Sequence, residues 1–171
     1  MLKTPRLLLR AWAAPDLAAL VRLADNPAVA RNLRDRFPSP YTPADGEAWL
    51  ELCAGELLQQ NWAIECDGEV VGGIGLAARG DVQRLSAEIG YWLGEPHWGR
   101  GIATEALVLL TEHVLATRDL IRLDAYVFAW NGASARVLEK AGYVREGVLR
   151  RAVVKGGEVC DAWMYARVKE R

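Results

Sequence analysis

The sequence has few of the residues that build metal sites and disulfide frameworks. Its 171 residues include three cysteines and two histidines. Cys53, Cys66 and Cys160 show no CxxC spacing, and an odd number of cysteines does not form a complete set of disulfides. His113 has no cysteine or carboxylate partner at metal-ligand spacing. We therefore expect no metal site, and buried free thiols in a reducing compartment, the cytoplasm.

Long apolar runs and an excess of charge are also missing. No apolar run approaches the length of a membrane span, and the residues from Met1 to Leu7 lack the apolar core of a signal peptide. The formal net charge is −1, so no overall field draws the chain to nucleic acid or to an anionic membrane. We expect neither as a partner. The length predicts a single domain over residues 1–171.

Local patterns predict alternating strands and helices. Thr42-Pro43 is typical of a helix start, Asp67-Gly68 of a hairpin turn and Gly142 of a helix end. The expected helices span residues 15–24, 43–59, 101–116 and 131–141. The expected strands span residues 6–12, 61–66, 69–77, 85–93, 123–129, 143–149 and 158–168. This order predicts an α/β fold with mostly antiparallel strands flanked by helices.

The most informative segment joins a strand to a helix through two glycines. The strand ends near Leu93, Trp98-Gly99-Arg100-Gly101 follows, and a strong helix then begins. Glycine permits positive φ angles and close backbone approach, and the first N–H groups of a helix attract phosphate. The segment matches neither GxGxxG nor GxxxxGK[ST]. Alone, it predicts either a site for an anion, best a pyrophosphate, or a tight turn with no ligand.

Together with a second segment, this loop resembles the GNAT superfamily of acetyl-CoA-dependent N-acetyltransferases, in particular its RimJ/RimL-like branch. The loop of that branch usually reads WGKGYATEA, and residues 98–106 read WGRGIATEA. Its later helix usually reads NxxSxxxxEKxGF, and residues 131–143 read NGASARVLEKAGY, with Tyr143 in place of Phe. Further matches extend the resemblance over nearly the whole chain. It implies a mixed, twisted sheet in which a central pair of strands is splayed.

The resemblance also implies a site for acetyl-CoA. Backbone N–H groups of the glycine loop would bind the pyrophosphate, with Arg100 adding charge nearby, and the free edge of the splayed strand would pair with pantetheine. Asn131 would bond to pantetheine, or serve as a plain helix N-cap, or both. The residues expected at this site are Tyr91, Trp92, Leu93, Trp98, Gly99, Arg100, Gly101, Ile102, Ala103, Thr104, Asn131 and Ser134.

Two side chains are candidates for the chemistry itself. Glu88 resembles the catalytic Glu of the histone-acetylating branch and would act as a general base; the alternatives are a structural ion pair and a solvent-facing strand residue. Many members carry a Tyr general acid where this chain has Leu138. That leaves Ser134, or a water, as proton donor to the thiolate, unless Ser134 is an ordinary helix-surface residue. A second base of some RimL-like enzymes would fall near Val153, which is apolar.

The sequence says less about the residues that would bind the amine. Trp62 and Trp92 could line a cleft or belong to the core. Arg31, Arg34 and Arg36 follow one another in a proline-flanked loop. They belong either to a solvated loop or to a site for an acceptor that carries negative charge. The acceptor itself, and the oligomeric state, a homodimer included, stay open.

The first hypothesis is therefore an N-acetyltransferase that acts by direct attack of a primary amine on acetyl-CoA in a ternary complex. At pH 7 an α-amine with a pKa near 7.8 is neutral about one time in seven, and a lysine near 10.4 far less often, so a general base would help. An N–H near Leu93 would polarise the carbonyl. No covalent intermediate is expected, because no Ser or Cys is paired with His. The alternatives are a non-catalytic acyl-CoA-binding module and a phosphate binder unrelated to CoA.

Overall fold

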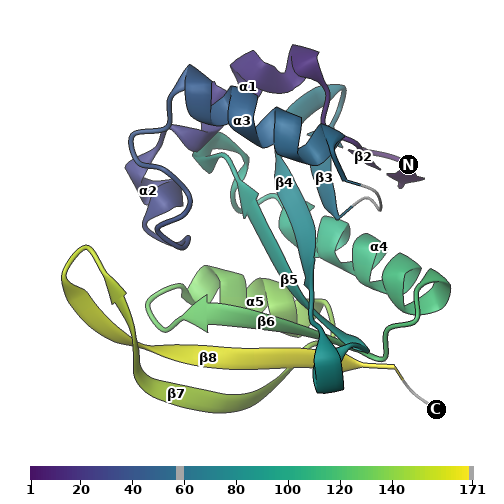
Figure 1. Ribbon diagram of the computed structural model, residues 1–171, viewed down its shortest axis with the longest axis vertical. Coiled ribbons are helices and arrows are strands. Elements are labelled where there is room, and N and C mark those ends of the chain that lie inside the picture. Colours follow the sequence, from purple (N-terminus) through teal and green to yellow (C-terminus); the bar gives the residue numbers. More distant parts are fainter. Residues whose placement is uncertain (57–59, 170–171) are drawn as a thin grey trace.

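The computed structural model describes residues 1–56 and 60–169. In this part of the chain eight strands form one sheet in the order β1-β2-β3-β4-β5-β6-β8-β7 (Figure 1). Neighbouring strands are antiparallel except β5 and β6, which are parallel. The strands are β1 (Leu2–Lys3), β2 (Leu7–Arg10), β3 (Asn61–Cys66), β4 (Glu69–Ala78), β5 (Ser86–Leu93), β6 (Arg122–Phe128), β7 (Val144–Lys155) and β8 (Glu158–Val168). The predicted mixed, mostly antiparallel sheet is confirmed.

Helices cover this sheet. They are α1 (Leu17–Ala24), α2 (Pro27–Ala30), α3 (Pro43–Ala54), α4 (Ile102–Thr117) and α5 (Gly132–Lys140). Figure 1 places α1 and α3 together at the top of the molecule and α5 beside β6 in the lower half. Helix α4 packs against β2, β5 and α5, so it connects the upper part of the molecule in Figure 1 with the lower part. Within the described residues, no helix is both long and apolar enough to cross a membrane.

Local signals set most element ends where the sequence predicts them. The Thr42 hydroxyl accepts the Asp45 N–H and Pro43 is the first helical residue of α3. Gly68 and Gly142 have φ angles of 84° and 80°, which glycine adopts without strain. Helix α3 ends at Ala54, earlier than predicted; positions 57–59 of the predicted helix lie outside the described residues.

Three features of the fold differ from the prediction. Strand β7 continues to Lys155 rather than ending at 149, because the chain passes through an irregularity at Arg151, where φ is 52°. Strand β1 and the single turn of α2 were not predicted. Helix α2 begins where the Asn26 side chain accepts the Ala28 N–H at 2.8 Å, with Pro27 as the first helical residue, the same start signal as Thr42-Pro43.

The core packs against α4, as the helical periodicity predicts. Leu107, Leu110 and Val114 are fully buried, and Ala103 is partly buried. Trp62 is 3% exposed and belongs to this core, so it does not line a cleft. All three cysteines are free thiols, as expected, but only Cys66 is buried; Cys53 and Cys160 are half-buried.

Tyr143, which stands where the resembling sequences have Phe, also lies in the core. Its hydroxyl lies 2.7 Å from the hydroxyl of Thr111 on α4, and both residues are buried. Burial raises the pKa of Tyr143 to about 12, so the phenol stays protonated. A buried hydroxyl without a partner would cost about 1–3 kcal/mol, and Thr111 removes that cost.

An ion-pair cluster ties the first segment of the chain to the sheet. Arg10 on β2 donates two hydrogen bonds to Asp16, at 2.7 and 2.8 Å, and one to Glu65 on β3, at 2.7 Å. The Asp16 carboxylate is buried and also accepts the Ala13 N–H. Burial alone would raise the pKa of Asp16, but the hydrogen bonds from Arg10 and Ala13 outweigh it and lower the pKa.

We expect Asp16→Asn to lower the free energy of unfolding at pH 7 by about 1–3 kcal/mol, because a charge-assisted bond is lost inside the protein. The folded-state pKa of Asp16 lies below its ordinary value, so its contribution is complete at neutral pH and is lost as the pH falls through the folded pKa. The difference from the parent protein should therefore shrink below about pH 4. Urea titrations from pH 7 to pH 3 measure it, with the exposed Asp119→Asn as control. An equal loss at every pH would contradict the prediction.

Candidate functional site

The parallel strands β5 and β6 are joined at only three register positions. Ser86–Glu88 pairs with Arg122–Asp124. Strand β5 nevertheless stays paired with β4 as far as Leu93, and β6 stays paired with β8 along its whole length. The two strands therefore diverge after Glu88, and Figure 1 shows the gap between them opening away from α4. The predicted splay is confirmed.

The divergence leaves backbone groups of β5 facing the gap. The Gly94 N–H donates to the Val71 carbonyl at 2.9 Å, so Gly94 faces β4. Because backbone groups alternate in direction along a strand, those of Leu93 and Tyr91 face the opposite side, toward the gap. The Leu93 carbonyl accepts the indole N–H of Trp98 at 2.8 Å. The N–H of Leu93 remains directed into the gap.

A cavity of about 1070 Å³ occupies the gap. Its lining brings together residues from β5, the glycine loop, the first turns of α4 and α5, and the loop that follows α2. Eleven of the twelve residues predicted for the acetyl-CoA site line it: Tyr91, Trp92, Leu93, Trp98, Gly99, Gly101, Ile102, Ala103, Thr104, Asn131 and Ser134. Arg100 does not. Its guanidinium lies 3.8 Å from Asp67 and 3.5 Å from His97.

The glycine loop presents a row of backbone donors to this cavity. Gly99 and Gly101 have φ angles of 72° and 75°. Among the described residues, no backbone carbonyl accepts an N–H from positions 99–104, and the first helical bond of this segment runs from Glu105 to the Gly101 carbonyl. No atom lies within 4 Å of where a Gly99 Cβ would stand. Such open donors at the start of a 16-residue helix fit a pyrophosphate.

Arg6 supports the loop from outside the cavity. Its guanidinium donates to the Arg100 carbonyl at 3.2 Å and to the Glu105 carboxylate at 2.7 Å. Burial of the Glu105 carboxylate would raise its pKa, but hydrogen bonds from Thr4 and Arg6 outweigh that effect and lower the pKa. Glu105 therefore stays ionised and keeps Arg6 in place. Glu105, which this chain shares with the WGKGYATEA pattern, thus has a structural role: it holds the arginine that supports the glycine loop.

The first turn of α5 brings polar groups into contact with β5. The Asn131 side chain accepts the Ser134 N–H at 3.1 Å, so Asn131 is the N-cap and also lines the cavity. The Ser134 hydroxyl lies 2.9 Å from the Tyr91 hydroxyl, which is also 3.2 Å from the Ser134 carbonyl. Burial raises the pKa of Tyr91 well above its usual value, so this phenol remains a donor.

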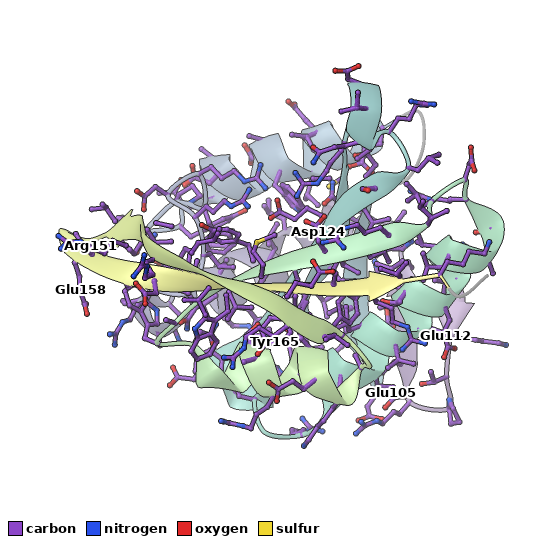
Figure 2. The ribbon with its side chains drawn as sticks, turned by 90° about the horizontal axis from the view of Figure 1, so that it is seen from below. Glu105, Glu112, Asp124, Arg151, Glu158 and Tyr165 are labelled. Carbon is purple, nitrogen blue, oxygen red and sulfur yellow. The ribbon has the colours of Figure 1, made fainter. Side chains whose placement is uncertain are left out.

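Glu88 lies where the strands part, and it takes part in an ion-pair network. Its carboxylate accepts a hydrogen bond from Arg34 at 2.5 Å and lies 4.0 Å from Arg79. Arg79 in turn donates to Asp124 on β6 at 2.5 Å. Asp124 is 4% exposed, and Figure 2 shows it on the inner part of β6, far from the hairpin tip at Glu158. Glu88 thus has the ion pair that the sequence left as an alternative, and it also lines the cavity.

Two positions that replace polar catalytic groups of the resembling sequences are apolar in space as well. Leu138 is fully buried against the core. Val153 is 9% exposed and packs with Phe128 and Ala162. Neither position offers a proton donor or acceptor to the cavity. Within residues 1–56 and 60–169, no group of three or more His, Cys, Asp or Glu side chains could hold a metal ion.

Several lining residues were missed by sequence reasoning. Arg136 and Lys140 on α5 line the cavity, and their i, i+4 spacing on one helix face could have revealed them. At the opposite end, Phe37 packs against Tyr41 and Trp92, with ring centroids 5.2 and 5.6 Å apart. Nothing in the sequence brings those three rings together, because they come from a loop and from β5.

Comparisons with known proteins bear on the fold and the family of the chain. A family model described as an acetyltransferase (GNAT) domain matches residues 6–144. The uncharacterized N-acetyltransferase YoaA of Bacillus subtilis (strain 168) is 38% identical over 112 residues, which cover 64% of this chain and 63% of that protein. The uncharacterized N-acetyltransferase p20 of Bacillus licheniformis is 28% identical over 174 residues, covering 98% of this chain and 96% of that protein.

A solved structure extends the likeness to a ligand complex. It is RimL, a ribosomal L7/L12 alpha-N-protein acetyltransferase, in complex with coenzyme A. It superimposes with a TM-score of 0.85 and 25% identity, covering 97% of this chain and 96% of that one. The neighbour therefore shares the fold, and its structure contains coenzyme A.

We expect Gly99→Ala to weaken CoA binding about tenfold. Alanine at a φ of 72° costs roughly 1–2 kcal/mol, and the loop either bears that strain or turns its N–H groups away from the phosphates. Isothermal titration with CoA measures the affinity. The control is Gly80→Ala, since Gly80 has open space around it and an ordinary φ of −114°. An unchanged CoA affinity in the Gly99 variant would contradict the assigned role of the loop.

Proposed function

The chain belongs to the GNAT acetyltransferase family, and from that premise we propose that it moves the acetyl group of acetyl-CoA to a primary amine by direct attack in a ternary complex. The observation that carries the proposal is the cavity between β5 and β6, into which the glycine loop, the free edge of β5 and the first turn of α5 all open. Residues 1–171 act as one catalytic domain in this proposal. The amine class includes protein N-termini, the kind of acceptor named for RimL.

The donor half of the site is built mainly from backbone. The N–H groups of residues 99–104 bind the pyrophosphate, and hydrogen bonds to a charged acceptor contribute about 1.5–3 kcal/mol each. Arg136 and Lys140, which also line the cavity, add positive charge to it. The edge of β5 at Tyr91 pairs with the pantetheine amides by strand addition.

The thioester carbonyl is polarised by the N–H of Leu93. As the amine attacks, the carbonyl oxygen gains negative charge, and a fixed donor aimed at that oxygen lowers the barrier. Trp98 holds the neighbouring peptide group of Leu93, because its indole N–H donates to the Leu93 carbonyl at 2.8 Å. The same residue begins the glycine loop, so Trp98 links the pyrophosphate site to the carbonyl site.

Two protons move during the reaction. A bond forms between the amine nitrogen and the carbonyl carbon, the carbon–sulfur bond breaks, and the electron pair leaves with sulfur. The amine proton passes to Glu88, directly or through water, and the Ser134 hydroxyl donates its proton to the thiolate. The proton held by Glu88 then returns to Ser134 through solvent, so both groups end as they began. Tyr91, held protonated by burial, directs the Ser134 hydroxyl from 2.9 Å away.

The first test is a transfer assay with acetyl-CoA and a panel of peptide N-termini, polyamines and other small amines. We expect acetylated amine by mass spectrometry and an equal amount of free CoA thiol. Because the attack is direct, double-reciprocal plots for the two substrates should intersect, and the protein itself should carry no acetyl group. An acetylated protein with parallel plots would contradict direct attack. Tight CoA binding with no transfer to any amine would support the non-catalytic alternative.

The second test is a double-mutant cycle on the Tyr91–Ser134 pair. We expect Ser134→Ala to lower kcat about 10–100-fold, the lower range of general acid catalysis, and Tyr91→Phe to lower it less. If Tyr91 acts through Ser134, the double variant has the kcat of Ser134→Ala alone. Tyr143→Phe is the matched control, since it breaks a similar hydroxyl pair in the core and should change stability rather than kcat. Multiplicative losses at Tyr91 and Ser134 would contradict this role.

A further inference from the structure

We propose that the amine acceptor carries a carboxylate and that Arg34 and Arg36 bind it. This inference rests on the proposed function and names the substrate class of the same site. It concerns the end of the cavity that the donor half leaves open. That end is formed by the loop after α2, here called the arginine loop (residues 31–38), together with α3 and the middle of β5.

The arginine loop is docked on both halves of the splayed sheet. Arg34 reaches Glu88 on β5, and Asp35 accepts a 2.7 Å hydrogen bond from Lys155 on β7. Arg31 stacks over Trp130, 5.4 Å from the ring centroid, and lies 3.9 Å from Glu158. Figure 1 shows this loop descending toward the β7–β8 hairpin, and Figure 2 shows Glu158 at the hairpin tip. The loop is therefore not a plain solvated loop, because its contacts place Arg34 and Arg36 on the cavity wall.

The charges at this end balance in number, but one of them has no partner. The lining contains Arg34, Arg36, Asp45 and Glu88. Asp45 is held in the α3 cap, where it accepts the N–H and the hydroxyl of Thr42 at 2.8 and 2.6 Å. Glu88 is paired with Arg34. Arg36 has no carboxylate within ion-pair distance in the described part of the chain, so its guanidinium is available to a ligand.

The unpaired Arg36 guanidinium, next to Arg34, discriminates among amines. A polyamine carries further ammonium groups, which two neighbouring guanidinium groups repel. A carboxylate instead matches the planar fork of arginine and accepts two parallel hydrogen bonds from it. Phe37 and Trp92 form an apolar wall in the same cavity, so an apolar group beside the amine is also accommodated.

Binding of the carboxylate also changes the surroundings of Glu88. In the described structure the Glu88 Oε1 atom accepts from Arg34. When Arg34 turns to the acceptor's carboxylate, Oε1 becomes available to the amine proton as the nitrogen–carbon bond forms. Arg79, 4.0 Å from the other oxygen, stays in place. Recognition of the correct acceptor thus frees the base that the reaction uses.

The experiment compares tripeptide amides that differ only at the second residue, Glu, Gln or Lys, over a range of first residues. Free amino acids and their amides form a second arm, which tells whether the carboxylate belongs to a side chain or lies next to the amine. In one of the two arms, we expect kcat/KM for the acceptor that carries the carboxylate to be at least tenfold higher than for its neutral amide counterpart. We expect the lowest kcat/KM for the Lys peptides and for spermidine. Equal rates within both arms, or a preference for Lys, would overturn the proposal.

Variants then test whether the two arginines cause the preference. Arg34→Gln and Arg36→Gln should each reduce the ratio between the carboxylate and neutral acceptors, and the double variant should bring it close to one. Arg31→Gln is the matched control from the same loop, because Arg31 does not line this cavity and should leave the ratio unchanged. A ratio that survives the double variant would overturn the assignment to Arg34 and Arg36.

A binding measurement separates this proposal from the proposed function. The acetylated Glu and Gln peptides, which need no turnover, are titrated into the protein with CoA present. Tighter binding of the Glu peptide, lost in the double variant, supports the carboxylate site even if no amine is acetylated. Rapid acetylation with equal binding of both peptides would leave the proposed function intact and overturn the carboxylate site.

Discussion

The departure of β5 from β6 after three paired residues is the constraint on which the rest of the site depends. Asp124 is buried at the last paired position of β6, opposite Glu88 on β5. Arg79 lies between them, 2.5 Å from Asp124 and 4.0 Å from Glu88. A buried carboxylate is tolerated because it is paired and hydrogen-bonded. This arginine therefore holds the two strands together at the place where they begin to diverge.

Because the gap exposes strand edges, most of the donor half is made of backbone groups. The donors are the N–H of Leu93 and the N–H groups of residues 99–104. Their directions are set by the path of the backbone and its φ angles, so most of the side chains at these positions are free to vary. This explains how RimL, at 25% identity, superimposes with a TM-score of 0.85. It also explains why Arg100, whose side chain lies outside the cavity, is not needed for the shape of the loop. Gly99 and Gly101 are different, since their positive φ angles are themselves the feature that shapes the loop.

Features set by a few consecutive residues could be predicted from the sequence, whereas features that depend on distant segments meeting in the fold could not. The hairpin at Asp67-Gly68, the cap at Thr42 and the glycine loop are local patterns, and the structure places them as expected. The extension of β7 past Arg151 was missed because a strand that continues through an irregularity has no continuous alternation. The Arg34–Glu88 pair joins residues 54 positions apart, and only the assembled fold brings them together. The roles of Glu88 and Ser134 stay predictions, with geometry that agrees with them.

The two halves of the site are thus held by different kinds of interaction, and this has a consequence for specificity. The donor half is embedded in the sheet and in α4, so changing it disturbs the core. The acceptor half depends on long side chains such as Arg34, 47% exposed, and on the Asp35–Lys155 pair, in which Asp35 is 80% exposed. Exposed ion pairs contribute about 0–1 kcal/mol each. The arginine loop can therefore exchange its charges with little effect on stability. Under the proposed function, one acetyl-CoA site then serves different amines through changes in this one loop.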